Sequence, residues 1–192
     1  MSRAKEFDEA EVLDQALELF RARGFKHTSF TDLVGELGVS RQSLYDTYGD
    51  KQALYQTALR RYLDRAIDRI RRQLETPAPI RQVLADFFDG LVAMSCDHSG
   101  AGCFMVNSMV ELSPHDADTR ALAQTHAREI EGLFASRLSA AQRKGEIAKS
   151  KDPVALARYF YHTTLGLAVA ARALGDKSSL RETGRLALQV LD

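Results

Sequence analysis

The chain has 192 residues, of which 45% are hydrophobic and 27% charged, and its formal net charge is zero. These values are typical of a globular chain with one or two small domains, and no apolar run reaches the ~20 residues of a membrane-spanning helix. A neutral chain has no domain-wide basic field, so contact with nucleic acid would have to depend on a local patch.

The amino-terminal segment MSRAKEFDEAEVL lacks the apolar region of a signal peptide, and we therefore expect a cytoplasmic protein. The two cysteines, Cys96 and Cys103, are too few for a disulfide framework. Residues 1–51 contain seven Lys/Arg and ten Asp/Glu, whereas residues 52–76 contain six Lys/Arg and three Asp/Glu. Any basic patch must therefore come from a few side chains.

Three short helices are predicted near the amino terminus. The first has an amphipathic face with the spacing i, i+3, i+4 and i+7, formed by Leu13, Ala16, Leu17 and Phe20. Gly24 is placed to end this helix. A second helix is predicted over residues 30–37, because Ser29 and Asp32 can form a capping box at its start and Gly38 can stop it.

The third predicted helix, residues 41–48, is unusually polar. Ser40 can cap its start, and Gly49 its end. Together with the tight turn LGVS before it, this segment has the pattern of a helix-turn-helix. Its inner side would be formed by Leu33, Leu37, Val39 and Leu44. The side chains left outside can donate to phosphates and base edges: Arg41, Gln42, Ser43, Tyr45, Thr47 and Tyr48.

The rest of the chain is also predicted to be helical. Asp50 caps a long fourth helix that runs to about Glu75, and TPAP at 76–79 is the candidate boundary, with Pro79 at the first position of the next helix. Further helices are expected over residues 80–96, 103–112 and 117–144, from Pro153 onward, and after a capping box of Ser179 and Glu182. We find no strand-like alternation, so the predicted fold class is all-α.

The carboxy-terminal helices are rich in small residues. The stretch TTLGLAVAARALG at 163–175 is apolar around most of its circumference, and Gly184 and Ala187 lie on the final helix. A helix that is apolar nearly all round must be buried on several sides. We expect these helices to form a dimer interface, and the alternative is the packed core of a monomer.

The segment FKHTSFTDLVGELGVSRQSLYDTYGDKQALY, with the preceding ALELFRARGF, resembles the DNA-binding domain of the TetR family of bacterial transcriptional regulators. The family pattern there is roughly G-V-S-x-x-x-L-Y-x-x-F-x-x-K-x-x-L, and this sequence departs from it at Tyr48, where Phe is commoner. The resemblance implies a three-helix helix-turn-helix domain, residues 1–51. That domain is joined to a helical ligand-binding and dimerisation domain, residues 52–192, in which residues 52–76 form the connecting helix.

The resemblance also implies roles for individual side chains. Thr28, Tyr48 and Lys51 would hold phosphates on either side of the groove, and Ser40 at the start of the third helix suits a phosphate too. The major groove would be contacted by Arg41, Gln42, Ser43 and Tyr45. Each could instead be a solvated polar residue, and Tyr45 could pack against the first helix. A dimer would place two such helices ~34–36 Å apart and predicts an approximately palindromic operator.

Members of this family respond to a small ligand in the carboxy-terminal domain, so a second site is expected. Its predicted walls are Phe87, Phe88, Leu91, Phe104, Met105, Met109, Phe134, Tyr159 and His162, although each could be an ordinary core residue. This set favours an apolar or aromatic ligand. Asn107, an amide within an apolar helix, would either fix a neighbouring loop or bind the ligand.

Cys103 follows GAG and is expected in the first turn of a helix, where unpaired amides and the helix dipole favour a thiolate. GCFMVN also resembles a segment of one family branch, some of whose members respond to electrophiles or oxidants. Cys103 is therefore a redox-sensing candidate, and the alternative is a small buried apolar residue. A partial metal site formed by Cys96, His98 and Cys103 is a weaker hypothesis.

The sequence contains no nucleophile elbow, phosphate loop or pair of catalytic carboxylates, so we expect neither an enzyme nor a cofactor. It predicts a dimeric regulator, a repressor released from its operator by a small apolar ligand or a thiol-reactive effector. The expected partners are double-stranded DNA, the effector and a second copy of the chain, without a membrane. The alternatives are an architectural DNA-binding protein without effector response, disfavoured by the neutral charge, and a helical enzyme or carrier, disfavoured by the polar third helix.

Overall fold

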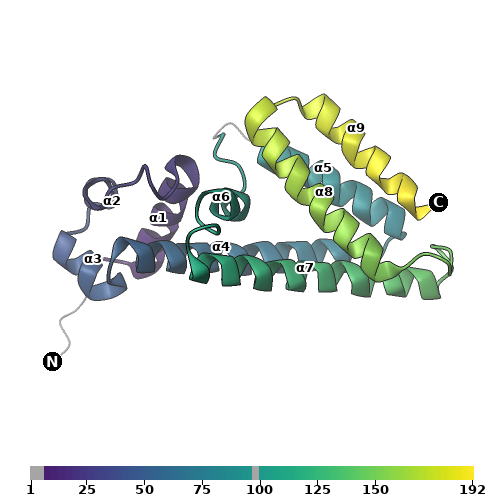
Figure 1. Cartoon of the computed structure of the whole chain (residues 1–192), viewed down its shortest axis with the longest axis horizontal. Helices are drawn as coiled ribbons and strands as arrows, with labels where there is room; N and C mark the ends of the chain where they lie inside the picture. Colours follow the sequence, from purple (N-terminus) through teal and green to yellow (C-terminus); the bar gives the residue numbers. More distant parts are fainter. Residues whose placement is uncertain (1–6, 97–99) are drawn as a thin grey trace.

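A computed structural model of the chain describes residues 7–96 and 100–192, and all its regular elements within these ranges are helical (Figure 1). The elements are α1 Glu9–Arg23, α2 Phe30–Leu37, α3 Arg41–Tyr48, α4 Lys51–Leu74, α5 Ile80–Ser95, α6 Phe104–Glu111, α7 Ala117–Arg143, α8 Pro153–Leu174, α9 Lys177–Ala187 and a 3-10 turn, η1, Leu188–Leu191. The predicted all-α fold class is confirmed. None of the helices within the described ranges combines the length and apolarity needed to cross a bilayer.

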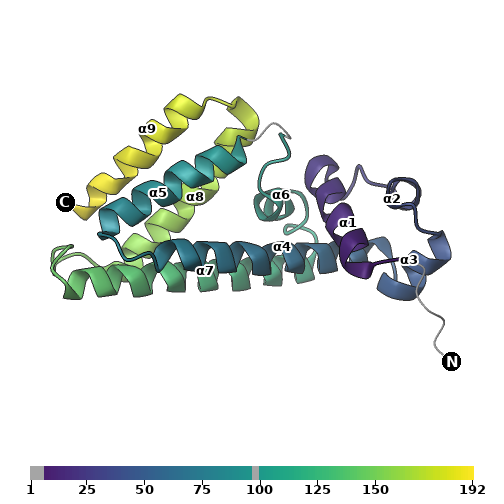
Figure 2. The same cartoon turned by 180° about the vertical axis from the view of Figure 1, so that it is seen from behind.

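The two longest helices, α4 and α7, run side by side along the molecule (Figures 1 and 2). At one end α1, α2 and α3 pack around the start of α4, and at the other end α5 and α8 cover α4 and α7, with α9 packed on α5 and α8. The short α6 lies between these two groups. The buried residues form two clusters, and α4 contributes Leu63 to the amino-terminal cluster and Ile67 to the carboxy-terminal one. A movement of α4 would therefore affect both ends.

Most helix ends follow the predicted signals. The Ser29–Asp32 capping box is present, and Ser40, Asp50 and Asp152 cap their helices with side-chain oxygens. These caps satisfy amide groups that have no partner inside the helix.

Two predicted cap positions are wrong, by one and by three residues. Pro79 is the N-cap of α5 rather than its first residue, and the Ile80 amide donates to Glu146 Oε2 at 2.6 Å. The last helix starts after Asp176, whose carboxylate accepts from two amides and caps the helix three residues before Ser179. Asp176 directly follows the left-handed turn at Gly175, so the helix can begin at once.

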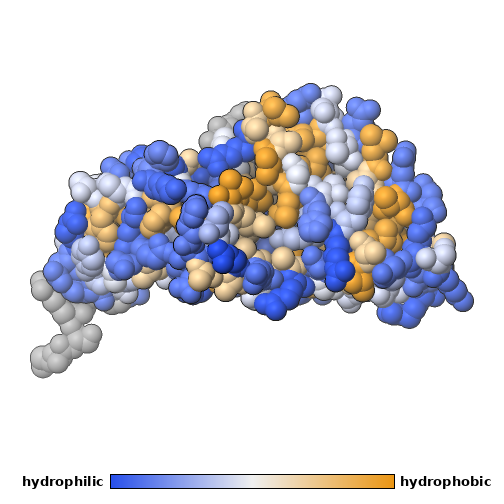
Figure 3. Space-filling view, in the orientation of Figure 1, coloured by the Kyte–Doolittle hydropathy of each residue, from blue (hydrophilic) through white to orange (hydrophobic). Residues whose placement is uncertain are grey.

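The small residues of α9 serve packing inside the subunit. A Cβ atom on Gly184 would lie 3.1 Å from Phe88 Cβ of α5, and Ala187 is buried as well. This position of Gly184 corrects the expectation that it lies between subunits. The large apolar side chains that α8 and α9 leave exposed are others: Val154, Tyr159, Val169, Leu174 and Leu186. Apolar surface over these two helices is visible in Figure 3.

Candidate nucleic-acid interface and internal cavity

The second and third helices are held by an apolar inner side that leaves one face of α3 outward. Leu33, Leu37, Val39 and Leu44 are all buried, as predicted. Gly38 has φ +64, in the left-handed region that favours glycine, and joins α2 to the turn before α3. The polar side of α3 therefore faces away from the domain core.

On this outward face, Arg41 and Tyr45 both contact the ring of Phe30. The guanidinium carbon of Arg41 is 5.1 Å from the Phe30 ring centre, and Arg41 Nη2 donates to Thr31 Oγ1 at 3.1 Å. The Tyr45 ring stacks on Phe30 with 4.5 Å between centroids and is 43% exposed. Tyr45 thus packs on α2 rather than on the first helix. Sequence reasoning missed Phe30, an apolar residue at the start of a helix.

Other polar side chains at the start of α3 make local hydrogen bonds. The Ser40 hydroxyl accepts from the Ser43 amide at 3.1 Å and donates to Ser43 Oγ at 2.8 Å. Gln42 is exposed, and its amide donates to Asp46 Oδ1 at 2.7 Å. Such exposed side-chain bonds can be exchanged for bonds to another molecule at small cost, since their net contribution is only about 1 kcal/mol.

The three residues predicted to hold phosphates use their side chains within the domain. Thr28 is 0% exposed and donates from Oγ1 to the Gly24 carbonyl, which contradicts a phosphate contact by its side chain. Lys51 Nζ donates to the carbonyls of Phe25 and Thr28, both at 3.0 Å. The Tyr48 hydroxyl donates to the Glu9 carbonyl at 2.8 Å. These bonds fix the α1–α2 loop and the start of α1.

An ion-pair cluster joins α1 to α4. Arg61 donates to both oxygens of Asp14, at 2.6 and 2.9 Å, and Arg65 adds a third bond at 2.9 Å. The hydrogen bonds from Arg61 and then Arg65 hold the pKa of Asp14 well below its usual range. Because the pairs are partly exposed, they contribute little to stability, and they join α1 to α4 at Asp14.

The α6 helix contacts the α1–α2 loop through Glu111. Its carboxylate accepts from the Phe25 amide at 3.0 Å and from the Lys26 amide at 2.7 Å. Gly24 has φ +84, and a Cβ atom there would lie 2.8 Å from Glu111 Oε2. Two charge-assisted bonds and a glycine-dependent approach therefore connect α6 to the helix-turn-helix.

Two further polar contacts tie α6 in place. Asn107 donates to the carbonyls of Ala101 and Arg21, at 2.9 and 3.3 Å, so its amide fixes the loop before α6 and does not line the cavity described below. The Ser108 and Tyr55 hydroxyls are 2.6 Å apart in the core. Burial raises the pKa of Tyr55 to about 12, and the phenol stays neutral and able to donate.

An internal cavity of about 150 Å³ lies between α4, α5, α6, α7 and α8. Of the residues predicted to line it, Phe87, Leu91 and Met105 do so, and the redox-sensing candidate Cys103 lies in its wall as well. The others lie elsewhere: Phe88, Phe104 and Phe134 are core residues, Met109 packs on the amino-terminal cluster, and Tyr159 and His162 are exposed. Helical spacing identified buried faces but not which of them meet at this cavity.

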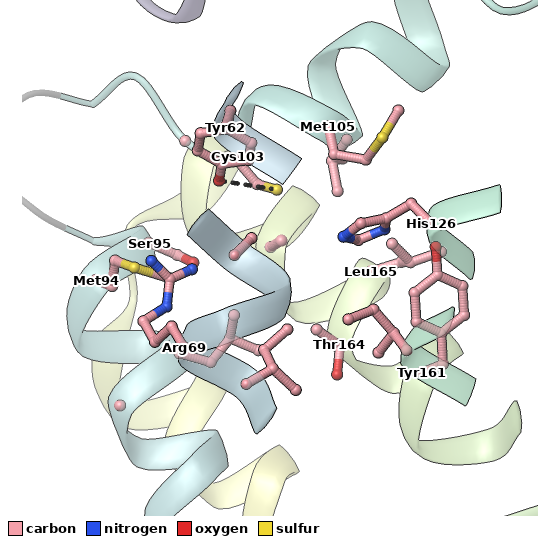
Figure 4. Close-up of a pocket in the computed structure, with 18 of the residues that line it drawn as sticks. Tyr62, Arg69, Met94, Ser95, Cys103, Met105, His126, Tyr161, Thr164 and Leu165 are labelled. Atoms are coloured by element: carbon pink, nitrogen blue, oxygen red, sulfur yellow. Dashed lines mark hydrogen bonds between the residues drawn. The ribbon is translucent and has the colours of Figure 1, made fainter. Parts of the chain in front are cut away.

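Sequence reasoning missed the polar lining of the cavity, which includes Arg69, His126, Tyr161 and Thr164 (Figure 4). His126 could have been found from its register, because the buried residues Ala123 and Ile130 lie three before and four after it on α7. Burial lowers the pKa of His126 to about 4 and raises that of Tyr161 to about 12. Both side chains are therefore neutral near pH 7.

Cys103 is the N-cap of α6, so it lies just before the first turn of the helix rather than within that turn as the sequence predicted. Its side chain lines the cavity. The Tyr62 hydroxyl donates to its Sγ at 3.4 Å (Figure 4), and burial, with Cys103 nearby, raises the pKa of Tyr62. Cys96 ends α5 as a free thiol, and His98 lies outside the described residues. Within the described ranges no three His, Cys, Asp or Glu side chains gather as metal ligands.

Comparisons with known proteins place this geometry among regulators. Residues 12–58 match the model of bacterial regulatory proteins of the tetR family, and residues 79–187 match that of the tetracyclin repressor-like C-terminal domain. The chain is 35% identical to the uncharacterized HTH-type transcriptional regulator YezE of Bacillus subtilis over the whole of both proteins. It is 32% identical to the HTH-type transcriptional repressor ComR of Escherichia coli, covering 88% of this chain and 82% of ComR.

Among solved structures, a CifR cysteine mutant, a TetR family transcriptional regulator complexed with 26bp double-strand operator DNA, superimposes with a TM-score of 0.89 at 25% identity. That match covers 99% of this chain and 100% of CifR. The reduced form of Escherichia coli NemR has the same fold, with a TM-score of 0.83 at 20% identity and 93% of each chain covered.

Proposed function

Because this chain belongs to the TetR family of DNA-binding transcriptional regulators, which are not enzymes, we propose that it is a dimeric repressor released from a palindromic operator by an effector. The observation that carries this proposal is the position of α6. Met105 of α6 lines the cavity, and Glu111 of the same helix binds the loop of the helix-turn-helix. A single short helix thus touches both candidate sites.

The DNA-binding unit of the proposal is residues 1–51, with α3 as the helix that enters the major groove. Arg41, Gln42 and Tyr45 are exposed on α3, and Arg and Gln have the fork geometry that recognises guanine and adenine edges. Ser40 and the first amides of α3 suit a phosphate. Operator DNA bound to CifR, a protein of the same fold, supports this assignment.

The effector and dimerisation unit of the proposal is residues 52–192, with 52–76 as the connecting segment. One helix-turn-helix reads little sequence, so we assign the dimer interface to the exposed apolar side chains of α8 and α9, above all Val169 and Leu186. Two α3 helices of the dimer would enter successive major grooves ~34–36 Å apart. The operator would then be approximately palindromic.

Transmission from cavity to DNA would pass through α6 and α4. An effector that displaces Met105 or Cys103 would shift α6 and the carboxylate of Glu111 with it. The loop held by Glu111 begins directly after α1, so its displacement would reorient the helix-turn-helix on α4. The effector can shift this equilibrium only by its different affinities for the two arrangements.

Two effector chemistries fit the cavity: a small apolar ligand, or a reagent that modifies Cys103. Cys103 lines the cavity, and its sulfur accepts a hydrogen bond from Tyr62. An unsaturated carbonyl compound would form a thioether with this sulfur, and the thiol proton would pass to the carbon beside the carbonyl. Either event would occur beside Met105, at the α6 end of the transmission path.

The test is fluorescence anisotropy on the DNA upstream of the reading frame, with the reduced protein and with protein treated with N-ethylmaleimide. Release of the wild type but not of Cys103→Ser would support a thiol-reactive effector. If neither is released, Cys103 is structural, and reversible ligands for the cavity are tested next. Absence of salt-dependent binding to any fragment of that DNA would contradict the repressor assignment itself.

A further inference from the structure

The cavity contains two buried polar side chains that the proposed switch does not use. His126 on α7 is 9% exposed and Tyr161 on α8 is 3% exposed, and both line the cavity. The two ring nitrogens of His126 and the hydroxyl of Tyr161 have no hydrogen-bond partner among the described residues. Leaving such groups unpaired costs about 1–3 kcal/mol each, so folding stability alone does not account for them.

Apart from Thr164, the lining near these groups is mainly apolar, and the charged residues that line the cavity are Arg21 and Arg69. Figure 4 shows His126 and Tyr161 on one side of the cavity and Arg69 on the opposite side. The apolar part of the lining includes Ala66, Ile70, Phe87, Leu91, Ile130 and Leu165. A carboxylate beside the neutral His126 would be buried on the side of the cavity opposite Arg69, which is costly for a charge without a close partner. An uncharged oxygen can instead accept from the Tyr161 hydroxyl or exchange a hydrogen bond with the imidazole.

The volume limits the size of the ligand. A cavity of about 150 Å³ in another protein holds one benzene molecule, and this cavity encloses about the same volume. A single six-membered ring with one or two small substituents therefore matches the size of the cavity.

We propose that His126 and Tyr161 form a polar subsite that binds the hydroxyl or carbonyl oxygen of an uncharged, ring-sized effector, whose apolar body fills the space between α4, α5 and α8. The inference rests on the proposed function in one respect, because it names the ligand class of that same cavity. Binding at this subsite links α7 and α8, while the ligand body contacts Met105 of α6.

The test uses isothermal titration calorimetry on the full-length protein without DNA, so that operator binding does not enter the result. The probes are p-cresol and acetophenone, with toluene as the apolar match and benzoate as the charged one. The matched variants are Tyr161→Phe, which removes only the cavity hydroxyl, and Tyr159→Phe, which removes an exposed hydroxyl of the same helix.

We expect p-cresol or acetophenone to bind the wild type more tightly than toluene. Tyr161→Phe should weaken that binding by about two- to tenfold, the value of one hydrogen bond. The affinity of Tyr161→Phe for toluene, and that of Tyr159→Phe for p-cresol or acetophenone, should equal the wild-type values. Tyr161→Phe should also raise the melting temperature of the free protein, because an unpaired buried hydroxyl is removed.

Three results would overturn the subsite. The first is equal affinity of the wild type for toluene and p-cresol. The second is that only benzoate binds and that Arg69→Ala abolishes this binding. The third is a melting temperature of Tyr161→Phe below that of the wild type. The repressor assignment would stand in all three cases, because anisotropy on the upstream DNA tests it separately. Conversely, if p-cresol binding depends on the Tyr161 hydroxyl but the protein does not bind the DNA upstream of its reading frame, the subsite is supported and the repressor assignment is contradicted.

Discussion

Arg41 is held in place by the ring of Phe30 and by Thr31, yet it remains exposed on α3. A guanidinium that is ordered before DNA arrives loses less conformational entropy on binding than a free one. Lys51, by contrast, donates hydrogen bonds from its ammonium group to two loop carbonyls. At the scale of single residues, we therefore propose different roles for the two cations: Arg41 in recognition and Lys51 in holding the loop.

Replacing Arg41 with Ala should weaken specific operator binding by about 1–3 kcal/mol and non-specific binding much less, because a base contact is lost. Anisotropy with operator and scrambled duplexes at several salt concentrations measures both. Arg128→Ala, an exposed arginine on α7, is the matched control and should change neither. An equal loss on both duplexes would remove Arg41 from base recognition.

His126 should make the protein less stable in acid. Burial lowers its pKa from 6.5 to about 4, so the unfolded chain binds a proton that the folded chain does not between these values. Both states are neutral above pH 6.5, and stability therefore falls as the pH drops from there toward 4, by about 2 kcal/mol at pH 5. Urea unfolding of wild type and His126→Leu at pH 7 and 5 measures the difference, and identical pH dependence in both would refute the assignment.

At the scale of elements, α6 is short but connects more of the molecule than its length suggests. Its start contributes Cys103 and Met105 to the cavity, and its end contributes Glu111 to the α1–α2 loop. The Tyr55–Ser108 bond anchors it to α4. An eight-residue helix has little stability of its own, so tertiary contacts decide where it lies.

Glu111→Gln should separate effector binding from DNA release. The amide has one acceptor oxygen and places an NH2 group near a backbone donor, so the variant should lose about 1–3 kcal/mol of stability. We expect effector affinity to stay near wild type while the effect of effector on operator affinity shrinks. Calorimetry and anisotropy on the same protein measure the two quantities. Full release at wild-type effector concentration would show that α6 does not transmit the signal.

Gly184→Leu tests the packing of α9 on α5. The new side chain would meet Phe88, whose Cβ atom lies 3.1 Å from the position of a Cβ on residue 184. Overpacking of this kind costs about 1–3 kcal/mol, so the midpoint of urea unfolding should fall. A variant that unfolds like wild type but no longer dimerises would instead place Gly184 between subunits.

For the whole molecule, the arrangement is a long α4–α7 pair with a candidate DNA-binding unit at one end and the cavity in the other half (Figure 1). The exposed apolar side chains of α8 and α9 lie on that second half, away from α3 (Figure 3). An interface there would leave both recognition helices free. Such a dimer would contact DNA at two half-sites at once.

Val169→Glu should disrupt that dimer. Val169 is 49% exposed on α8, and a carboxylate there would face its counterpart or apolar surface in the partner. Sedimentation velocity should show a monomer, and operator affinity should fall at least tenfold because one half-site is lost. Val110→Glu, an exposed valine on α6, is the control and should remain dimeric. An unchanged sedimentation coefficient in Val169→Glu would place the interface elsewhere.

The sequence alone determined the helices, most of their caps and the inner side of the helix-turn-helix, because spacing and capping act within a few residues of the chain. It also determined which side chains α3 leaves outside. Only the tertiary structure decided that Thr28 is buried, that Gly184 packs on Phe88, and that His126 and Tyr161 share one cavity. These features depend on contacts between distant segments, such as the bond from Phe25 to Glu111 across 86 residues. Residue patterns along one helix show that a face is buried, and only packing shows what it meets.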